Sequence, residues 1–549
     1  MANVNFTNLD QAFDTGTSDI IAFNTLGGAV VGFDYSYMTT GGHDWEFRGT
    51  GITDAGAEPT GGTVDDIQVD LDNDNANAPE VIITGLGGVA ATSFGINVGT
   101  AAEQRDSFWA AALGGDDTIT FDLADFTQSF QFSGDGVNAS NGGLFVAGDD
   151  SFLDAGTALT NGNSWVFGDF EFLTNNSNVA AGDDIFTVGL RQIMGDAFSV
   201  ANGSTLVGGD DVITPARIGN LGGAMRVTGD SDFNAGGVFG GDDLIDFRAT
   251  DLTAFTFGLE LVGDVWQNFS NGVLVGGRDT IYGGETTNDV IYGDWQSNTG
   301  YAEGGRDQLF GLGGDDTIFG NSGRDILFGN GGSDSLDGGD DGDFMFGLAG
   351  QDTLNGGSGN DSMDGGNGND VFIAGSGGDT LVGGEGDDGG DAGAGNDVVQ
   401  GGTGKDNYFG GTGADNMDGG GGNDTLSGGD QNDTLLGGNG FDALLGGNDN
   451  DVLNGGDLND ILFGGAGFDT FQFAITGDTD TLKDYAGGAG VTDVIQLLGF
   501  GAAFDSFAEV MAAATDNGVD TTINFGNGDV LIIEGVVKAD FNADDFLFG

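Results

Sequence analysis

The sequence predicts an all-β fold, a parallel β-roll or β-solenoid built from nonapeptide repeats, and three observations lead to this prediction. An aspartate recurs every nine residues from Asp307 to Asp469, nineteen in all, without interruption. Glycine supplies 113 of the 549 residues, whereas proline occurs three times. The 88 acidic residues comprise 77 Asp and 11 Glu, and Asp favours turns whereas Glu favours helices. These features indicate a long series of regular turns.

The charge of the chain limits its partners. With 12 basic residues, the formal net charge is -76, which repels nucleic acid and therefore excludes it as a partner. High charge with much glycine is also typical of disordered chains. However, hydrophobic residues make up 38% of the chain and phenylalanine occurs 43 times, so we expect folding once cations neutralise the acids. The absence of cysteine excludes disulfides and thiolate metal sites.

The repeat itself predicts a coil of two turns and two strands. Full copies span Gly356–Asp364 and Gly365–Ile373. Six Gly- and Asp-rich residues should form a turn, because glycine accepts positive φ, and three residues around a central apolar one should form a short strand. Two copies then make an 18-residue coil. One copy departs from the pattern, because Asp388 is followed by Gly389 and Gly390. The apolar residue two positions after the aspartate is expected inside, as at Leu309, Ile318, Leu327, Leu336, Leu354, Leu381, Leu426, Leu453 and Leu462.

Stacked turns would place aspartates of one charge in rows, which requires a counterion. Calcium accepts six to eight carboxylate and carbonyl oxygens in irregular geometry, whereas magnesium demands a tight octahedron. If each ion bridges two successive turns on one side, the nineteen turns hold at most about 17 ions, and folding and metal binding become one event. The predicted ligands in and near the repeats are Asp279, Asp289, Asp307, Asp316, Asp325, Asp334, Asp343, Asp352, Asp361, Asp370, Asp379, Asp397, Asp406, Asp415, Asp424, Asp433, Asp442, Asp451, Asp460 and Asp469.

These nonapeptides resemble the repeats-in-toxin (RTX) family, and the resemblance covers residues 276–473. It implies a parallel β-roll that binds several Ca²⁺ ions. It also implies export by a type I secretion system from a low-calcium cytoplasm, followed by folding outside the cell. The first residues of the chain show no basic and apolar leader, and no run approaches 18 apolar residues, so neither a cleaved leader nor a transmembrane segment is expected.

Residues 114–275 predict a wider solenoid that continues into the roll. Gly-Asp-Asp turns alternate with single Gly-Asp turns at Asp135, Asp169, Asp196, Asp230 and Asp264. This spacing indicates coils of roughly 27 to roughly 34 residues, a period typical of solenoids. The second aspartates of the pairs are further candidate calcium ligands: Asp117, Asp150, Asp184, Asp211 and Asp243.

The two ends differ from the repeats. Residues 1–113 predict a β-rich cap or interaction region, with a helix over 101–113. Residues 474–549 predict a small β-rich cap with one short helix through 510–514, opened by a capping box of Ser506 and Glu509. The ending Asp545–Phe548 resembles the acidic and apolar end of a type I secretion signal.

No catalytic motif stands out. The single histidine excludes a His-Glu-x-x-His zinc protease, and Gly-x-Ser-x-Gly is absent. His43 is the most enzyme-like position, but it has no nearby nucleophile, and Arg105, Arg191 and Arg217 are scattered. A two-carboxylate glycosidase stays open, although nothing singles out a pair.

We therefore predict no enzyme, but a secreted, calcium-binding structural protein of the cell surface. It would fold on calcium and assemble with itself into a surface layer or filament. The alternatives are an RTX adhesin or glycan-binding matrix protein, with cell-surface polysaccharide as partner, and a β-helix polysaccharide lyase or epimerase.

Overall fold

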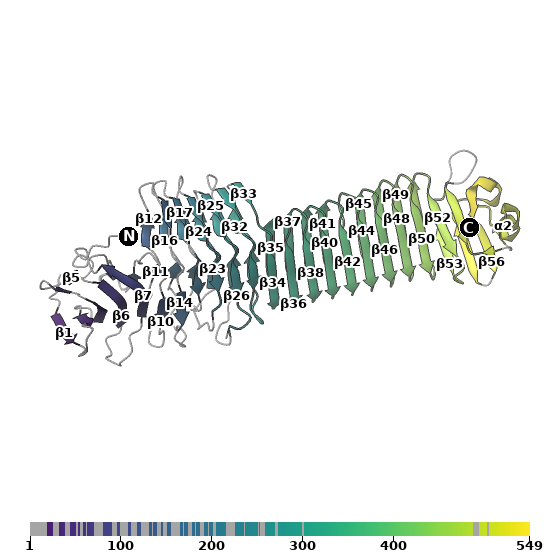
Figure 1. Cartoon of the computed structure of the whole chain (residues 1–549). Helices are drawn as coiled ribbons and strands as arrows, with labels where there is room; N and C mark the ends of the chain where they lie inside the picture. The colour runs from purple at the N-terminus through teal and green to yellow at the C-terminus, as the bar shows by residue number, and fades with distance from the viewer. Residues whose placement is uncertain are drawn as a thin grey trace. The chain divides into compact units, whose positions relative to one another are not determined.

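The computed structural model describes residues 301–549 except 487–492, 502, 503 and 527, most positions between 178 and 298, and only strands before residue 178. The chain forms two compact units, Met1–Gly314 and Asp315–Gly549. Both consist mainly of parallel strands (Figure 1). Among the described residues, no helix is long and apolar enough to cross a membrane.

The second unit is a β-roll of 18-residue coils, as predicted. Every strand pairs in parallel with the next strand but one, so that two columns of strands form. The first column consists of β35 (Thr317–Ser322), β37 (Ser335–Asp340), β39 (Thr353–Ser358), β41 (Val371–Ser376), β43 (Gly389–Asp391), β45 (Asn407–Thr412), β47 (Thr425–Asp430), β49 (Ala443–Asn448), β51 (Ile461–Ala466) and β53 (Thr479–Leu482). The second consists of β36 (Ile326–Gly331), β38 (Phe344–Ala349), β40 (Ser362–Asn367), β42 (Thr380–Glu385), β44 (Val398–Thr403), β46 (Asn416–Gly421), β48 (Thr434–Asn439), β50 (Val452–Asp457), β52 (Thr470–Ala474) and β54 (Val494–Leu498).

The core of the roll is one row of side chains from each column. The apolar residue two positions after each repeat aspartate is fully buried, as at Leu354, Leu381 and Leu453. The strands are longer than the predicted three residues, because the glycine pair after the apolar residue stays in the parallel ladder. The turn is correspondingly shorter. At Gly357 this extension uses a positive φ of 98°, which explains the glycine there.

In the repeat that lacks an apolar residue, aromatic side chains of the two adjacent coils occupy the core. Gly390 pairs with Phe372 in the coil before and with Tyr408 in the coil after. Both aromatic side chains are fully buried, and their ring centroids lie 6.1 Å apart. Two large side chains therefore compensate for one missing side chain, and the stack of coils continues without a gap in register.

A cap closes the C-terminal end, as predicted. It contains α2 (Phe507–Ala513), β55 (Ala514–Asp516), β56 (Thr521–Gly526), β57 (Asp529–Ile533), two 3₁₀ turns, η4 (Lys538–Asp540) and η5 (Ala543–Asp545), and β58 (Phe546–Phe548). β57 continues the first column beside β53, and β58 continues the second beside β54. β56 pairs with β57 in the antiparallel direction.

The predicted capping box of α2 does not form. Ser506 is the N-cap residue, but its hydroxyl donates to the Glu509 carboxylate, 2.6 Å away, rather than capping a main-chain N–H. The helix begins at Phe507 and ends at Ala513, one residue before the predicted end.

The first unit contains wider coils of four strands each. Successive coils are 27, 32, 36 and 28 residues apart where the aspartate ladder can be followed, which exceeds the predicted range at one step. The first strands of the coils are β10 (Thr118–Phe121), β14 (Ser151–Asp154), β18 (Ile185–Phe186), β22 (Val212–Ile213), β26 (Leu244–Asp246), β30 (Thr280–Tyr282) and β34 (Gln308–Gly313). The second strands are β11 (Gln131–Ser133), β15 (Trp165–Phe167), β19 (Gln192–Met194), β23 (Met225–Thr228), β27 (Leu259–Val262) and β31 (Val290–Tyr292).

Two further columns complete these coils. The third strands are β12 (Gly136–Ala139), β16 (Phe170–Leu173), β20 (Ala197–Val200), β24 (Ser231–Asn234), β28 (Val265–Asn268) and β32 (Trp295–Asn298). The fourth strands are β13 (Leu144–Val146), β17 (Asn178–Ala180), β21 (Thr205–Val207), β25 (Gly237–Phe239), β29 (Val273–Val275) and β33 (Tyr301–Glu303). Within every column the pairing is parallel.

An antiparallel sheet precedes the wide coils. It consists of β1 (Asp19–Thr25), β2 (Gly32–Met38), β3 (Asp44–Thr50), β6 (Thr63–Asp70) and β7 (Val81–Ala90), and β7 pairs with β10. The short strands β4 (Thr53–Asp54) and β5 (Pro59–Gly61) form a separate pair, and β8 (Ile96–Val98) pairs with β9 (Phe108–Ala110). β9 lies inside the predicted helix over 101–113, so that prediction is wrong at 108–110; the other residues of that segment lie outside the described ones.

Candidate metal centres

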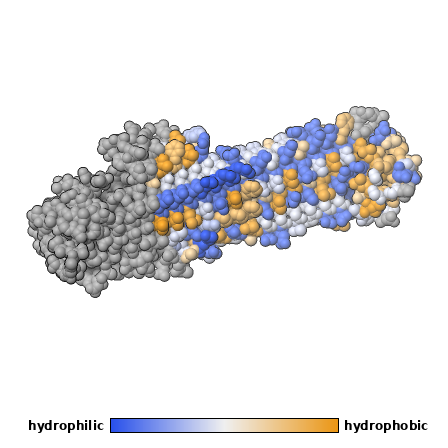
Figure 2. Space-filling view, in the orientation of Figure 1, coloured by the Kyte–Doolittle hydropathy of each residue, from blue (hydrophilic) through white to orange (hydrophobic). Residues whose placement is uncertain are grey.

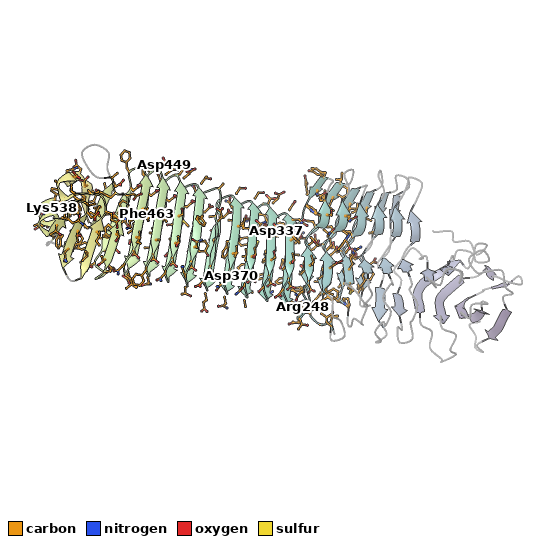
Figure 3. The ribbon with its side chains drawn as sticks, turned by 180° about the vertical axis from the view of Figure 1, so that it is seen from behind. Arg248, Asp337, Asp370, Asp449, Phe463 and Lys538 are labelled. Carbon is orange, nitrogen blue, oxygen red and sulfur yellow. The ribbon has the colours of Figure 1, made fainter. Side chains whose placement is uncertain are left out.

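The repeat aspartates of the roll form two buried rows, one at each side of the coils. From Asp316 to Asp469 every one of them is at most 3% exposed. From Asp334 onward, each uses Oδ1 to accept the main-chain N–H of the aspartate one coil earlier; for example, Asp343 Oδ1 lies 2.8 Å from the main-chain nitrogen of Asp325. Asp370, labelled in Figure 3, accepts from Asp352 in the same way, at 2.8 Å. The carboxylates therefore fix the stacking of the turns.

The second carboxylate oxygen has no donor from the protein. From Asp334 to Asp469, no hydrogen bond reaches Oδ2 of any repeat aspartate, although these atoms are buried. A buried acceptor without a donor costs about 1–3 kcal/mol, and more when it is charged. A whole row of such buried atoms requires bound protons or cations.

A glycine five residues before most of these aspartates leaves room for such a partner of Oδ2, and alanine replaces it at 374 and 392. A Cβ added to Gly356 would lie 2.5 Å from Asp361 Oδ2 and 2.6 Å from the carbonyl oxygen of Ala374, one coil on. Gly347 has the same surroundings, with Asp352 Oδ2 at 2.5 Å and the Gly365 carbonyl at 2.7 Å. Two acceptor oxygens thus face one small space from which every side chain is excluded. This space fits a cation.

The aspartate rows are electrostatically unfavourable without cations. Burial raises the pKa of Asp343 to about 7, and the neighbouring Asp361 contributes to this increase. Burial also raises the pKa of Asp379 to about 7 and that of Asp460 to about 8. The cause is the low dielectric around each carboxylate, to which the like charge one coil away is added.

The donor set fits calcium better than other metals. Among the described residues, no group of three or more His, Cys, Asp or Glu side chains converges on one point, so each site combines few carboxylates with main-chain carbonyls. All of these donors are hard oxygens, and carbonyl oxygens with irregular geometry suit Ca²⁺ rather than Zn²⁺ or Mg²⁺.

A second ladder, which was not predicted from the sequence, runs along the outside of the turns. The residue before the repeat aspartate is often Asn or Asp, and its Oδ1 accepts the main-chain N–H one coil later. Asn360 Oδ1 accepts from Gly378 at 2.9 Å, and Asn432 Oδ1 accepts from Asn450 at 2.9 Å. The inner and outer ladders point in opposite directions along the stack. The Asn or Asp that often precedes the repeat aspartate is the sequence feature from which this outer ladder could have been predicted.

Three further aspartates join the inner rows without having been predicted. Asp388 accepts the N–H of Asp370 at 2.8 Å, although its copy lacks the apolar residue. The nearby hydroxyl of Tyr408 faces the same space at Gly383 as Asp388 Oδ2. Asp480 and Asp493 accept from Asp460 and Asp469, and so carry the two ladders into the cap. The nine-residue spacing pointed to Asp388, whereas the cap residues are out of register in the sequence.

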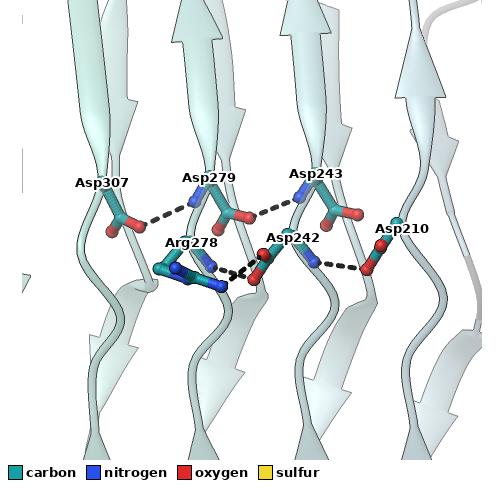
Figure 4. Close-up of polar contacts among 6 residues, drawn as sticks. All are labelled: Asp210, Asp242, Asp243, Arg278, Asp279 and Asp307. Atoms are coloured by element: carbon teal, nitrogen blue, oxygen red, sulfur yellow. Dashed lines mark hydrogen bonds and ion pairs between the residues drawn. The ribbon is translucent and has the colours of Figure 1, made fainter.

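The first unit contains the same pair of ladders. Asp243 Oδ1 accepts the N–H of Asp211, and Asp279 Oδ1 accepts that of Asp243, both at 2.8 Å. Figure 4 shows this inner ladder continuing to Asp307, and beside it the outer ladder. In the outer ladder, Asp242 accepts the N–H of Arg278 at 3.0 Å. The Gly-Asp-Asp pair therefore supplies one aspartate to each ladder.

The remaining predicted residues lie as follows. Asp184 and Asp211 are buried in the inner ladder, with 2.7 Å between the Asp184 main-chain nitrogen and Asp211 Oδ1. Asp289 lies apart from it, and its oxygens accept from Leu259 N–H, Gly284 N–H and the Thr287 hydroxyl. Asp117, Asp150, His43, Arg105, Arg191 and Arg217 lie outside the residues whose side chains the structure describes.

The comparison with protein-family models agrees with this geometry. The family model for the RTX calcium-binding nonapeptide repeat matches seven segments that together span residues 275–471. A comparison with curated proteins gave no match. Among solved structures, the extracellular lipase LipA from Serratia marcescens matches with 16% identity over 48% of this chain and 45% of the lipase chain. Its TM-score of 0.17 indicates little overall likeness in shape.

RTX nonapeptide repeats bind several Ca²⁺ ions, and the two rows of buried aspartates with their glycine spaces are the residues available for this in the roll. Residues 275–471 therefore form an RTX calcium-binding repeat segment with a parallel β-roll.

Proposed function

We propose that this protein is exported by a type I secretion system, folds on calcium outside the cell, and assembles with itself into a surface layer or filament. The calcium-binding roll is typical of secreted proteins. The ligands we propose are the aspartates predicted from the sequence, with Asp388 added to the rows. The protein would serve as a structural component rather than an enzyme.

The observation that carries self-assembly is a row of exposed apolar side chains on one column of the roll. Ile373 and Phe409 are each 49% exposed and Leu445 is 38% exposed. The strand register places them in one line, each two coils from the next, with Asp391 and Ser427 between them. Figure 3 labels two further residues of the same line, Asp337 and Phe463.

The spacing of this row suits a second copy of the same chain. Ile373, Phe409 and Leu445 recur at every second coil, which is about 9.6 Å along the stack at about 4.8 Å per coil, and Phe463 extends the line one coil beyond Leu445. A copy shifted by one coil could place its own apolar residues in the intervals. In Figure 2, hydrophobic patches interrupt the hydrophilic surface of the roll at intervals. Bound calcium would favour this contact between two copies, because it reduces the net negative charge by which they repel each other.

The experiment is a calcium titration followed together by circular dichroism and light scattering. We expect a coil-to-β transition, after which scattering rises far beyond that of one chain. The double variant Phe409→Ser, Leu445→Ser should fold at the same calcium concentration but scatter as a monomer. The matched control is Leu436→Ser, a half-buried position in the other column. A parent protein that folds into a stable monomer would overturn assembly and favour an adhesin or a glycan-acting protein.

A further inference from the structure

The wide coils contain a second row of aspartates that faces the inner ladder. It consists of the aspartates of the single Gly-Asp turns, Asp230, Asp264 and Asp294, each of which immediately precedes the third strand of a coil. All three are fully buried. These residues lie outside the Gly-Asp-Asp turns, so the ligand prediction from the sequence did not include them.

The two rows meet because glycines of each turn lie against carboxylates of the other. A Cβ added to Gly276, in the turn that leads to Asp279, would lie 2.7 Å from Asp264 Oδ2. Conversely, Gly263, beside Asp264, lies directly against Asp279 Oδ2 and the carbonyl oxygen of Gly293. One coil earlier, Gly229 lies against Asp243 Oδ2 and the Gly263 carbonyl. The same glycine-lined arrangement as in the roll thus recurs here.

Three carboxylates of these two rows each have one oxygen that accepts no hydrogen bond. Asp243, Asp264 and Asp279 are at most 2% exposed, and no hydrogen bond reaches their Oδ2 atoms. Their Oδ1 atoms accept main-chain N–H groups, that of Gly277 for Asp264, at 3.0 Å. Each of these three side chains thus keeps one buried oxygen aimed at the opposite turn.

Three of the described arginines of this unit pair with other groups. Arg278 contacts Asp242 at 3.1 Å, and Arg248 contacts Asp246 at 2.7 Å. Arg226 lies over the Trp266 ring, 3.8 Å from its centroid. No ion pair in the described part of the chain involves Asp243, Asp264 or Asp279. Buried carboxylates without a base require a proton or a metal ion.

The two rows, which the glycine contacts place side by side, also repel each other electrostatically. Burial raises the pKa of Asp264 well above its usual value, and the charges of Asp230 and Asp307 raise it further. The pKa of Asp279 is raised by burial and then by Asp264 and Asp243. Carboxylates of both rows therefore share one low-dielectric region, where a divalent cation would neutralise two of them.

We propose that the wide coils bind divalent cations of the calcium type between these two rows. The ligands are spread over successive sites, each with at most two carboxylates: Asp243 Oδ2 lies with the Gly263 carbonyl oxygen, Asp279 Oδ2 lies with that of Gly293, and Asp264 Oδ2 faces them from the opposite row. These sites precede the nonapeptide segment or overlap only its first residues, and they do not depend on the self-assembly proposed above. They make the folding of the first unit calcium-dependent as well.

The positions of the tryptophans allow a test that reports on the first unit alone. The five tryptophans of the chain all precede residue 296, and Trp266 and Trp295 follow Asp264 and Asp294 closely. Tb³⁺ replaces Ca²⁺ at oxygen sites and emits when a tryptophan within a few ångströms transfers energy to it. Tryptophan-sensitised Tb³⁺ emission of the full chain therefore detects ions in the wide coils and not in the roll.

We expect strong sensitised emission from the parent protein, and its loss when Ca²⁺ is added in excess. Asp264→Asn should reduce the emission at least twofold. The matched control, Asp242→Asn, changes the same charge at an exposed position and keeps the Oδ1 acceptor, so the emission should stay unchanged. Equal emission from Asp264→Asn and Asp242→Asn, or no sensitised emission from a parent protein whose roll folds on calcium, would overturn the proposal.

A second variant keeps the test decisive if Asp264→Asn does not fold. The double variant Trp266→Phe, Trp295→Phe leaves every carboxylate in place and removes the two tryptophans that closely follow this row of aspartates in the sequence. Its emission should fall at least twofold while circular dichroism stays the same, and unchanged emission would refute sites between these rows. Tb³⁺ emission reports on cation binding, whereas light scattering reports on self-assembly. The two proposals can therefore fail independently.

Discussion

The two oxygens of a repeat aspartate have different functions. Oδ1 connects adjacent coils through a main-chain N–H, and Oδ2 faces the glycine space where a cation fits. Asp361 shows both, with Oδ1 accepting from Asp343 in the manner of its neighbours. Different substitutions of one aspartate should therefore separate the contribution of cation binding by Oδ2 from that of the hydrogen bond to Oδ1.

Asp361→Ala should raise the calcium concentration at the folding midpoint and reduce the steepness of the transition. It removes a ligand and also leaves the buried N–H of Asp343 without an acceptor, which costs about 1–3 kcal/mol. Asp361→Asn should have the smaller effect, since it keeps the acceptor. Calcium titrations by circular dichroism would measure both. Asp364→Asn, outside the rows, is the control, and midpoints that do not differ among all three proteins would refute the ligand assignment.

The same carboxylates predict how calcium-free protein responds to acid. The pKa values of Asp343 and Asp379 are about 7 and that of Asp460 is about 8 in the fold, against an ordinary value of 3.8. A carboxyl with a raised pKa binds its proton more tightly in the folded state. Its contribution to stability is therefore complete below about pH 4 and is lost as the pH rises through about 6 to 8.

We therefore expect calcium-free protein to gain β-structure on acidification from about pH 8 to about pH 4. With calcium present the trend reverses, because protons compete with the metal and the folding midpoint moves to higher calcium concentration. Circular dichroism over a pH series, with and without chelator, measures both trends. Calcium-free protein that folds best at the alkaline end of this range would contradict the assignment of buried carboxylates.

Among the structural elements, the nonapeptide coil was the most predictable, since its period is constant. The nine-residue spacing of aspartates predicted burial of residues such as Leu354 and a coil made of two consecutive repeats. The wide coils were predictable only in outline, because their length varies from 27 to 36 residues and four strands share one coil. The burial of Asp264 depends on a contact between two different turns, which no single period in the sequence expresses.

The glycines of one coil provide a matched pair of substitutions. Gly419→Ala should raise the calcium concentration at the folding midpoint, because the new Cβ would lie 2.6 Å from Asp424 Oδ2 and 2.7 Å from the Gly437 carbonyl. Folding itself should persist, since Ala374 and Ala392 occupy the corresponding position in two other repeats. Gly421→Ala, two residues away, meets one atom at 3.9 Å and should be tolerated. Calcium midpoints and thermal unfolding of both variants would show the difference. Equal tolerance of the two substitutions would argue against a cation beside Gly419.

For the whole molecule, the net charge of -76 dominates the unfolded state. Without calcium at neutral pH, we expect an expanded chain with a radius of gyration of roughly 90 Å or more. Calcium should contract it in one cooperative step, which small-angle X-ray scattering would measure. Magnesium at equal ionic strength should not, because stacked turns do not offer its octahedral geometry. Contraction by magnesium or by NaCl alone would show that screening, rather than specific sites, drives folding.

The pairing of each strand with the next but one also constrains how such a chain can change in length. Inserting or deleting two consecutive repeats adds or removes one whole coil, about 4.8 Å of stack, and leaves both ladders and the cap in register. A change of one repeat keeps the motif intact but exchanges the two columns, so that β57 and β58 of the cap would meet the wrong partners. Gene duplication or slippage within this segment should therefore yield functional variants in steps of two repeats, and rolls differing by an odd number should require a rebuilt cap.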